Sequence, residues 1–123
     1  MNIITLLNAK DIFNQIAQIK ISSKLAYKIV KFYKSIEVEE EFYNNKRNEI
    51  IDLYAERDEN GQFVVENNMI KIVADKAAEA NEAMQDLNNM EVEIPNIRFT
   101  LAELEEVKLS AADMYVLDAF IDE

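Results

Sequence analysis

The chain of 123 residues contains a single glycine, Gly61, and a single proline, Pro95. These residue types interrupt regular structure most strongly, and a fold of many strands needs turn residues every 8–12 positions or so. Their scarcity therefore favours long helices. Half of the residues are apolar, which argues against intrinsic disorder and suits a core of ordinary size. We expect one helical domain over residues 1–123.

In the first half of the chain, apolar residues are spaced as in two successive helices. Asn8 is a candidate cap for the first helix, in which apolar residues recur at helical spacing from Ile12 to Ile19. Ser22 is a candidate cap for the second, and no glycine or proline follows before Asn60. We therefore predict one helix of about 35 residues, bent near 37–41, where charge interrupts the apolar spacing. Its apolar stripe is Leu25, Ile29, Phe32, Ile36, Tyr43, Ile50 and Leu53, and Glu39 and Lys46 occupy two further positions of that seam.

Asn60 and Gly61 tolerate a positive φ, so the segment 58–61 is the predicted end of this helix. The next helix is predicted over 69–89, where apolar residues alternate at spacings of three and four and alanines permit close approach. We expect it to pack antiparallel against the second half of the preceding helix. Its predicted seam consists of Ile70, Val73, Ala77, Ala80, Met84 and Leu87.

The remaining segments predict short elements. Residues 63–65 are either a strand or the entry to the helix over 69–89, and the alternating segments 91–95 and 97–99 suit short strands or extended chain. Thr100 with Glu103 forms a capping box for a short helix, and Ser110 is the expected cap of the last one. The predicted fold is mainly α, a long helical hairpin with short flanking helices and one small β-hairpin or extended segment.

Charge is unevenly distributed along the chain. Residues 1–34 carry six lysines and one acidic residue, whereas residues 35–123 carry seven basic and 23 acidic residues, for a net charge of −11 overall. A 4-4-3 spacing would place four of the lysines on one helix face. The candidate partner-binding residues are Lys20, Lys24, Lys28, Lys31 and the neighbouring Tyr27.

Two interpretations of these lysines are open. They form a basic patch for nucleic acid or an acidic partner, or they face the chain's own carboxylates. We favour the second interpretation and expect no binding of nucleic acid. The patch contains no arginine, whose planar fork suits phosphate, and the net charge of −11 repels DNA at long range.

The composition argues against most kinds of catalysis. The chain has no cysteine and no histidine, so thiol nucleophiles, imidazole bases and the usual zinc sites are excluded. One glycine cannot build a phosphate-binding loop or a dinucleotide fingerprint, and the segment 58–61 lacks the alternating carboxylates of a calcium loop. We expect no enzyme activity, no catalytic, cofactor-binding or metal-binding residues, and no cofactor. The chain also has no signal sequence or apolar run of about 20 residues, so we expect neither membrane binding nor secretion by its own signal.

Several segments, taken in order, resemble a family of small uncharacterised proteins of tailed phages and prophages of Gram-positive bacteria. They are Asn8-Ala9 and the segments 20–24, 49–61, 91–94, 109–113 and 117–121. The resemblance implies a phage origin and a place in the host cytoplasm or on the virion. It implies no activity, because the family is a domain of unknown function.

We therefore expect a non-enzymatic module for protein–protein interaction, used as an accessory in virion or tail morphogenesis. The alternative is an acidic inhibitor of a host defence protein, such as a restriction or CRISPR nuclease, acting by mimicry of nucleic acid. The expected partner is a protein, either another copy of this chain or a phage or host protein.

Overall fold

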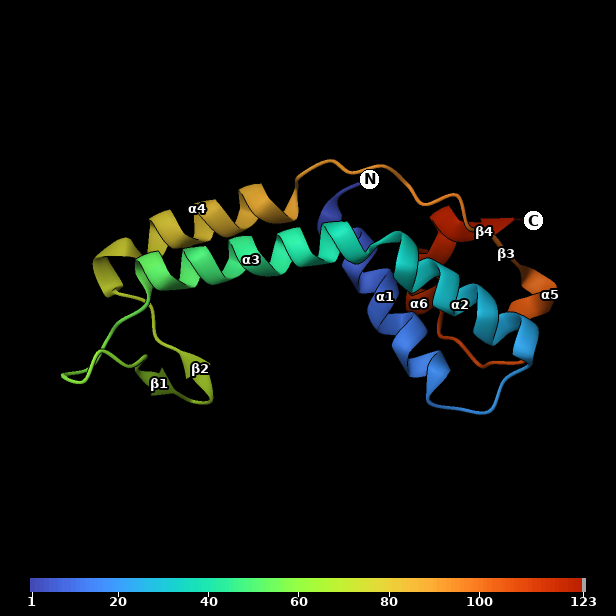
Figure 1. Ribbon diagram of the computed structural model, residues 1–123, viewed down its shortest axis with the longest axis horizontal. Coiled ribbons are helices and arrows are strands. Elements are labelled where there is room, and N and C mark those ends of the chain that lie inside the picture. The colour runs from blue at the N-terminus through green and yellow to red at the C-terminus, as the bar shows by residue number, and fades with distance from the viewer. Residues whose placement is uncertain (123) are drawn as a thin grey trace.

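The computed structural model describes residues 1–122, and helices dominate it, as the sequence predicts (Figure 1). One group of helices lies at one end of the molecule, and a helical hairpin with a small β-hairpin lies at the other. The helices are α1 (Ile3–Ala17), α2 (Ser23–Ser35), α3 (Glu37–Tyr54), η1 (Ala74–Lys76), α4 (Ala77–Asn88), α5 (Leu101–Leu104), α6 (Ala111–Leu117) and η2 (Asp118–Phe120). The strands are β1 (Val65–Glu66), β2 (Met69–Ile70), β3 (Phe99–Thr100) and β4 (Ile121–Asp122).

Helix α1 begins at Ile3, so the prediction that Asn8 caps it is wrong. Asn8 is an exposed residue inside the helix. Ile3 and Leu6 are fully buried and extend the apolar face of Phe13 toward the N-terminus. The backbone N–H of Ile3 also donates to the carbonyl of Met90 at 2.8 Å, which fixes the start of α1 through a contact distant in sequence.

The predicted long helix is two helices, α2 and α3, which meet at Ile36 with φ −111° and ψ 5°. The prediction of a bend near 37–41 is therefore correct to within a residue. Ser22 caps α2 as predicted, because its hydroxyl accepts from the N–H of Leu25 at 3.2 Å. Helix α3 ends at Tyr54, well before Gly61, because the backbone after it pairs with the β-hairpin region. There the N–H of Glu56 donates to the carbonyl of Lys71 at 2.8 Å.

The strands β1 and β2 form an antiparallel hairpin in which Val65 pairs with Ile70. Asn67 and Asn68 make its turn, with φ values of 54° and 63°. Left-handed conformations at two central residues are typical of two-residue hairpin turns, and asparagine tolerates them well. The predicted helix over 69–89 is therefore wrong at its start, because 69–70 is a strand and α4 begins only at Ala77.

Helices α3 and α4 lie side by side and antiparallel, which confirms the predicted hairpin (Figure 1). Ala80 and Leu87 of the predicted seam are buried, but Ala77 is exposed. Leu53 is wrongly predicted too, since 68% of its surface is exposed. Tyr43 of the predicted stripe does face α4, as expected, and its hydroxyl donates to Oδ1 of Asn88 at 2.7 Å.

The two charged positions predicted for the seam behave differently. Lys46 is exposed and its ammonium lies 3.1 Å from Glu49 of the same helix, so it neither enters the seam nor pairs across it. Glu39 is half-buried, and its Oε2 lacks a hydrogen-bond partner among the described residues.

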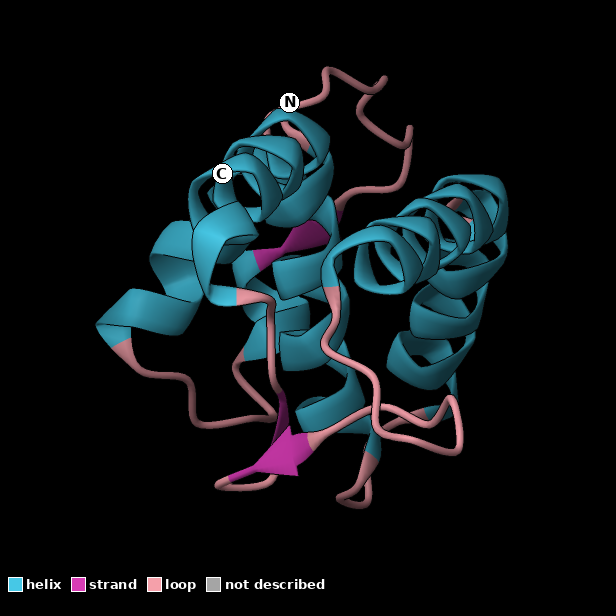
Figure 2. Cartoon of the chain, turned by 90° about the vertical axis from the view of Figure 1, so that its left-hand side faces the viewer, coloured by secondary structure: helices cyan, strands magenta, loops and turns pink. Residues whose placement is uncertain are grey.

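Two hydrophobic clusters stabilise the fold. In the larger one, which α1, α2, α5 and α6 share with β3 and η2, Phe13 lies 4.7 Å from Phe32 and 4.8 Å from Phe99 between ring centroids. The smaller cluster joins α1 to α3 and α4 through Ile3, Tyr43 and Leu87. Figure 2 shows how little of the chain is strand beside these helices.

The C-terminal region is fixed by local caps and one parallel strand pair. The capping box of Thr100 and Glu103 is confirmed, as is the cap of α6 by Ser110. The strand β3 pairs with β4 and not with the segment 91–95, where only Glu91 bridges to Asn2. Within residues 1–122, no helix has the length and apolar character that crossing a bilayer requires.

Candidate functional site

The structure does not place all four predicted lysines on one helix. Lys20 lies in the loop before α2, so only Lys24, Lys28 and Lys31 share a helix. The ammonium of Lys28 lies 2.6 Å from Oε1 of Glu103 and donates to the carbonyl of Arg98 at 2.9 Å. This lysine therefore faces the chain's own carboxylate, which is the interpretation that we favoured for the patch.

The other members of the candidate set point outward. Lys24 and Lys31 are exposed, and the ammonium of Lys31 lies 4.8 Å from the ring centroid of Tyr27. Tyr27 itself is 62% exposed. A role of these residues in partner binding remains a prediction, now without Lys28 and with Lys20 on a separate segment.

The Glu103 carboxylate joins β3, α5 and α2. Its Oε1 accepts from Lys28 and from the backbone and hydroxyl of Thr100, and the hydrogen bond of Lys28 is the main reason why the pKa of Glu103 is lowered. The neighbouring Glu106 accepts from the hydroxyl and the N–H of Ser22, both at 2.6 Å, and these bonds lower its pKa as well. Glu106 thus anchors the start of α2, and Glu103 anchors its middle.

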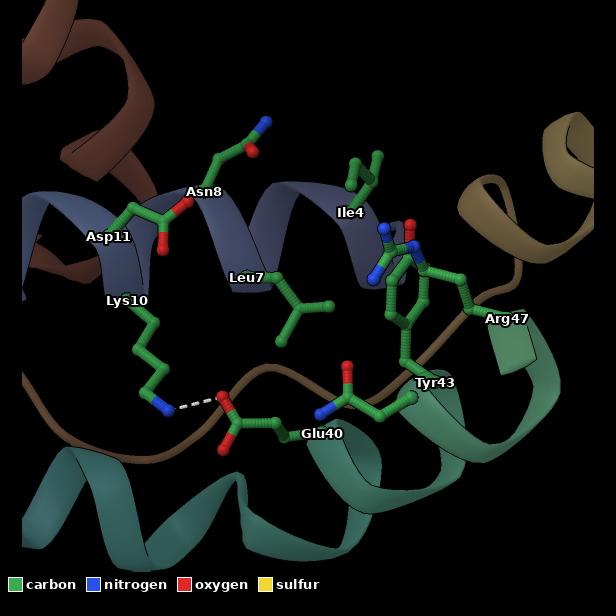
Figure 3. Close-up of a pocket in the computed structure, with 9 residues that line it drawn as sticks. Ile4, Leu7, Asn8, Lys10, Asp11, Glu40, Tyr43 and Arg47 are labelled. Carbon is green, nitrogen blue, oxygen red and sulfur yellow. Dashed lines mark hydrogen bonds and ion pairs between the residues drawn. The ribbon is translucent and has the colours of Figure 1, made fainter. Parts of the chain in front are cut away.

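A polar cavity of about 380 Å³ lies between α1 and α3 (Figure 3). Lys10 of α1 and Glu40 of α3 point toward each other across it and form an ion pair, while Leu7 and Tyr43 supply apolar walls. Besides this ion pair, the charged residues that line the cavity are Asp11 and Arg47. Because the ion pair links the two helices, we interpret the polar groups of this cavity as contacts that hold α1 to α3. Within residues 1–122, no cluster of three or more carboxylates is placed to hold a metal ion.

A more apolar groove of about 430 Å³ lies where α3, α4 and the β-hairpin meet. Met69 in β2 projects into solvent at its edge with 72% of its surface exposed, whereas Met84 of α4 is half-buried. The apolar residues that line the groove are Ile50, Ile51, Met69, Ile70, Ile72 and Met84, with Ala80 between them.

Sequence analysis missed this groove. The prediction placed 69–73 in a helix, whereas strand β2 and the segment after it bring Met69 and Ile72 to the groove beside Ile50 and Ile51. The signal that identifies the hairpin beside the groove is Asn67-Asn68 between Val64-Val65-Glu66 and Met69-Ile70, because asparagine tolerates the left-handed backbone of a two-residue turn.

The segment of the chain that forms the groove is acidic overall. Residues 37–90, which form α3, the β-hairpin and α4, contain fourteen acidic and five basic residues. Arg47 is the only formally charged residue among those that line the groove within the described part of the chain. The arrangement is therefore an apolar depression on a negatively charged lobe.

A second exposed apolar feature runs along α2 and α3. Tyr27, Val30, Val38, Phe42 and Leu53 lie on the side of these helices opposite the buried residues, and we call them the outer stripe. Val38 is 77% exposed.

In comparisons with protein families, with curated proteins and with solved structures, the chain has no match. The resemblance to phage proteins therefore stays a prediction.

Proposed function

We propose that the protein is a non-enzymatic module that binds a basic protein partner in the groove between α3, α4 and the β-hairpin. The observation that supports this function best is the high exposure of Met69 beside an apolar depression. Binding sites commonly combine an apolar floor with a few polar groups at the edge, and methionine adapts to partners of different shape.

The chemistry of the partner follows from the charge of the lobe. Fourteen acidic residues against five basic ones over 37–90 attract a positively charged surface and repel an acidic one. An amphipathic helix with apolar residues on one face and lysine or arginine on the other suits the apolar lining of the groove and the net negative charge of residues 37–90. Apolar contacts then supply affinity, and charge supplies orientation and a faster encounter.

An NMR titration tests this proposal without knowledge of the natural partner. The probe is a synthetic peptide of 18 residues made of leucine and lysine in an amphipathic pattern, and the control peptide has glutamate in place of lysine. We expect the leucine–lysine peptide to shift the amide signals of Ile50, Ile72 and Met84, and the glutamate peptide to shift none of them. Shifts confined to acidic residues outside the groove would contradict the proposal.

Variants of the β-hairpin add a matched control. Met69→Gln removes an apolar groove residue, whereas Val65→Gln alters a residue of the same hairpin that is 62% exposed and does not line the groove. The first variant should weaken the peptide and the second should not.

Two roles are compatible with such a module. The resemblance to phage proteins favours an accessory of virion or tail morphogenesis, whereas the acidic lobe favours an inhibitor that occupies the basic surface of a host nuclease. Purified virions that contain the protein support the assembly role. Inhibition of DNA cleavage by a restriction or CRISPR nuclease supports the other role, provided that Met69→Gln relieves it.

A further inference from the structure

We propose that a second interaction surface, formed by α2 and the loop before it, binds an acidic segment of a protein partner. An aliphatic side chain of that segment occupies an apolar cavity of about 340 Å³ between the end of α1, the loop 18–22 and α2. None of the residues that line this cavity lines the groove, so the inference does not depend on partner binding in the groove.

The lining of this cavity is apolar except for one lysine. Lys20 is the only charged residue that lines it within residues 1–122. Ile29 is a buried lining residue, whereas Ile19 and Val30 have 51% and 43% of their surface exposed. The other lining residues are Ala17, Ile21, Ala26 and Tyr33. A cavity of this size and lining suits an aliphatic side chain, because contact removes apolar surface of both molecules from water.

The segment around the cavity is positively charged. Residues 17–35 contain five lysines and no acidic residue, and only Lys28 of the five forms an ion pair within the described part of the chain. Two carboxylates, those of Glu103 and Glu106, form hydrogen bonds with this segment, which leaves a net charge of +3. The negatively charged lobe with α4 and the β-hairpin lies at the other end of the molecule (Figure 1). Screening over about 8 Å at physiological salt weakens its repulsion of an acidic ligand.

Exposed side chains of α2 connect the cavity to these lysines. Residues three and four apart are neighbours on a helix, so Val30 of the outer stripe adjoins both Tyr27 and Lys34. Tyr27 in turn adjoins Lys31, whose ammonium lies 4.8 Å from the centroid of its ring. From Lys24 to Lys34 the helix extends about 15 Å, so a ligand with a single carboxylate reaches only some of the lysines. The surface therefore suits a segment in which several acidic residues flank an aliphatic one.

Two other anionic ligands, nucleic acid and a membrane surface, fit this region less well. Single-stranded nucleic acid stacks its bases on aromatic rings and is commonly held by arginine, but residues 17–35 contain no arginine and the ammonium of Lys31 lies over the ring of Tyr27. A helix that binds an anionic membrane buries its apolar face in the lipid. The apolar face of α2 is buried in the protein core instead, through Leu25, Ile29 and Phe32.

An NMR titration of the full chain with an acidic peptide of seven residues tests the proposal. The peptide has one central leucine between glutamates, and two control peptides have serine in place of the leucine or glutamine in place of the glutamates. We expect the first peptide to shift the amide signals of Ala26 and Val30 but not those of Ile50 and Met84, which line the groove. One buried side chain and a few exposed ion pairs predict a Kd of about 0.1–1 mM. Each control peptide should bind about tenfold more weakly or worse.

Variants of the chain separate the local charge from the net charge. Lys20→Glu together with Lys31→Glu should weaken the leucine peptide about tenfold or more. Lys46→Glu together with Lys76→Glu makes the same change in net charge on α3 and η1 and should alter the Kd less than about twofold. All four lysines are exposed, so folding should be intact by circular dichroism.

Several outcomes would overturn the proposal. They are the absence of shifts at about 5 mM peptide, equal affinity for the leucine and serine peptides, and equal weakening by the two pairs of lysine variants. Tighter binding of single-stranded RNA or of anionic vesicles that Lys20→Glu with Lys31→Glu abolishes would assign the surface to that ligand instead. Met69→Gln should leave the peptide bound, and loss of binding in this variant would place the acidic peptide in the groove.

Discussion

Replacing Phe13 by alanine tests whether the aromatic cluster stabilises the fold as the packing indicates. Phe13 is fully buried, and its ring contacts those of Phe32 and Phe99 at centroid distances of 4.7 and 4.8 Å. Loss of a buried phenylalanine side chain removes about 2–3 kcal/mol of transfer free energy. The cavity that remains adds about 1–2 kcal/mol, which gives a total of about 3–5 kcal/mol.

The assay is urea unfolding followed by circular dichroism at 222 nm. A domain of this size has a free energy of unfolding of about 6–18 kcal/mol, so the variant should still fold but unfold at a much lower urea concentration. The slope of free energy against urea should not change, because the surface exposed on unfolding is nearly the same.

Tyr115→Ala is the matched control, since Tyr115 is an aromatic residue with 85% of its surface exposed. We expect it to change the free energy of unfolding by less than about 0.5 kcal/mol. The reasoning is refuted if Phe13→Ala costs less than about 1 kcal/mol, or if Tyr115→Ala costs as much.

Three further predictions concern stability, pH and binding. Ala80→Glu should lower the free energy of unfolding by about 3–5 kcal/mol, because it places an unpaired charge at a residue with only 5% of its surface exposed. Ala77→Glu, at an exposed position one turn earlier, should have almost no effect, and equal costs would disprove the α3–α4 packing. Glu103→Gln should destabilise most at neutral pH, because the folded pKa of Glu103 is lowered from its ordinary 4.5. The stabilisation by this carboxylate is present above pH 4.5 and is lost as pH falls through the pKa that Glu103 has in the folded state. Urea titrations would contradict this prediction if the difference in free energy of unfolding between Glu103→Gln and the wild type stayed constant down to pH 3. Fluorescence anisotropy at about 0.15 M salt should show no binding of duplex DNA or single-stranded RNA, since screening to about 8 Å weakens any lysine contact. Micromolar binding that Lys24→Glu together with Lys31→Glu abolishes would refute that expectation.

Local signals predicted the helical elements and several of their ends. The scarcity of glycine and proline indicated helices, and the caps at Ser22, Thr100 and Ser110 depend on side chains within three residues of the bonds that they make. The antiparallel α3–α4 pair followed from apolar spacing, which fixes a helix face without knowledge of the rest of the chain.

The elements that sequence analysis missed depend on distant contacts. Helix α3 ends at Tyr54 because the backbone that follows pairs with residues 71–73, and propensity alone gives no reason to stop there. The ion pair of Lys28 with Glu103 joins residues that are 75 positions apart, so helical spacing grouped this lysine with its exposed neighbours. The groove is formed partly by the same hairpin, so it could not be predicted once the hairpin had been predicted as a helix.

The affinity of the groove for a basic amphipathic helix tests the proposed function most directly. Isothermal titration calorimetry with the leucine–lysine peptide compares the wild-type chain with Met69→Gln and Val65→Gln. Loss of one buried apolar side chain costs about 1.5–3 kcal/mol, and 1.4 kcal/mol is a factor of ten in Kd. We predict that Met69→Gln weakens binding by about tenfold or more and that Val65→Gln matches the wild type. Equal affinity of all three chains for this peptide, or equal affinity of the wild type for the leucine–glutamate peptide, would contradict binding in the groove.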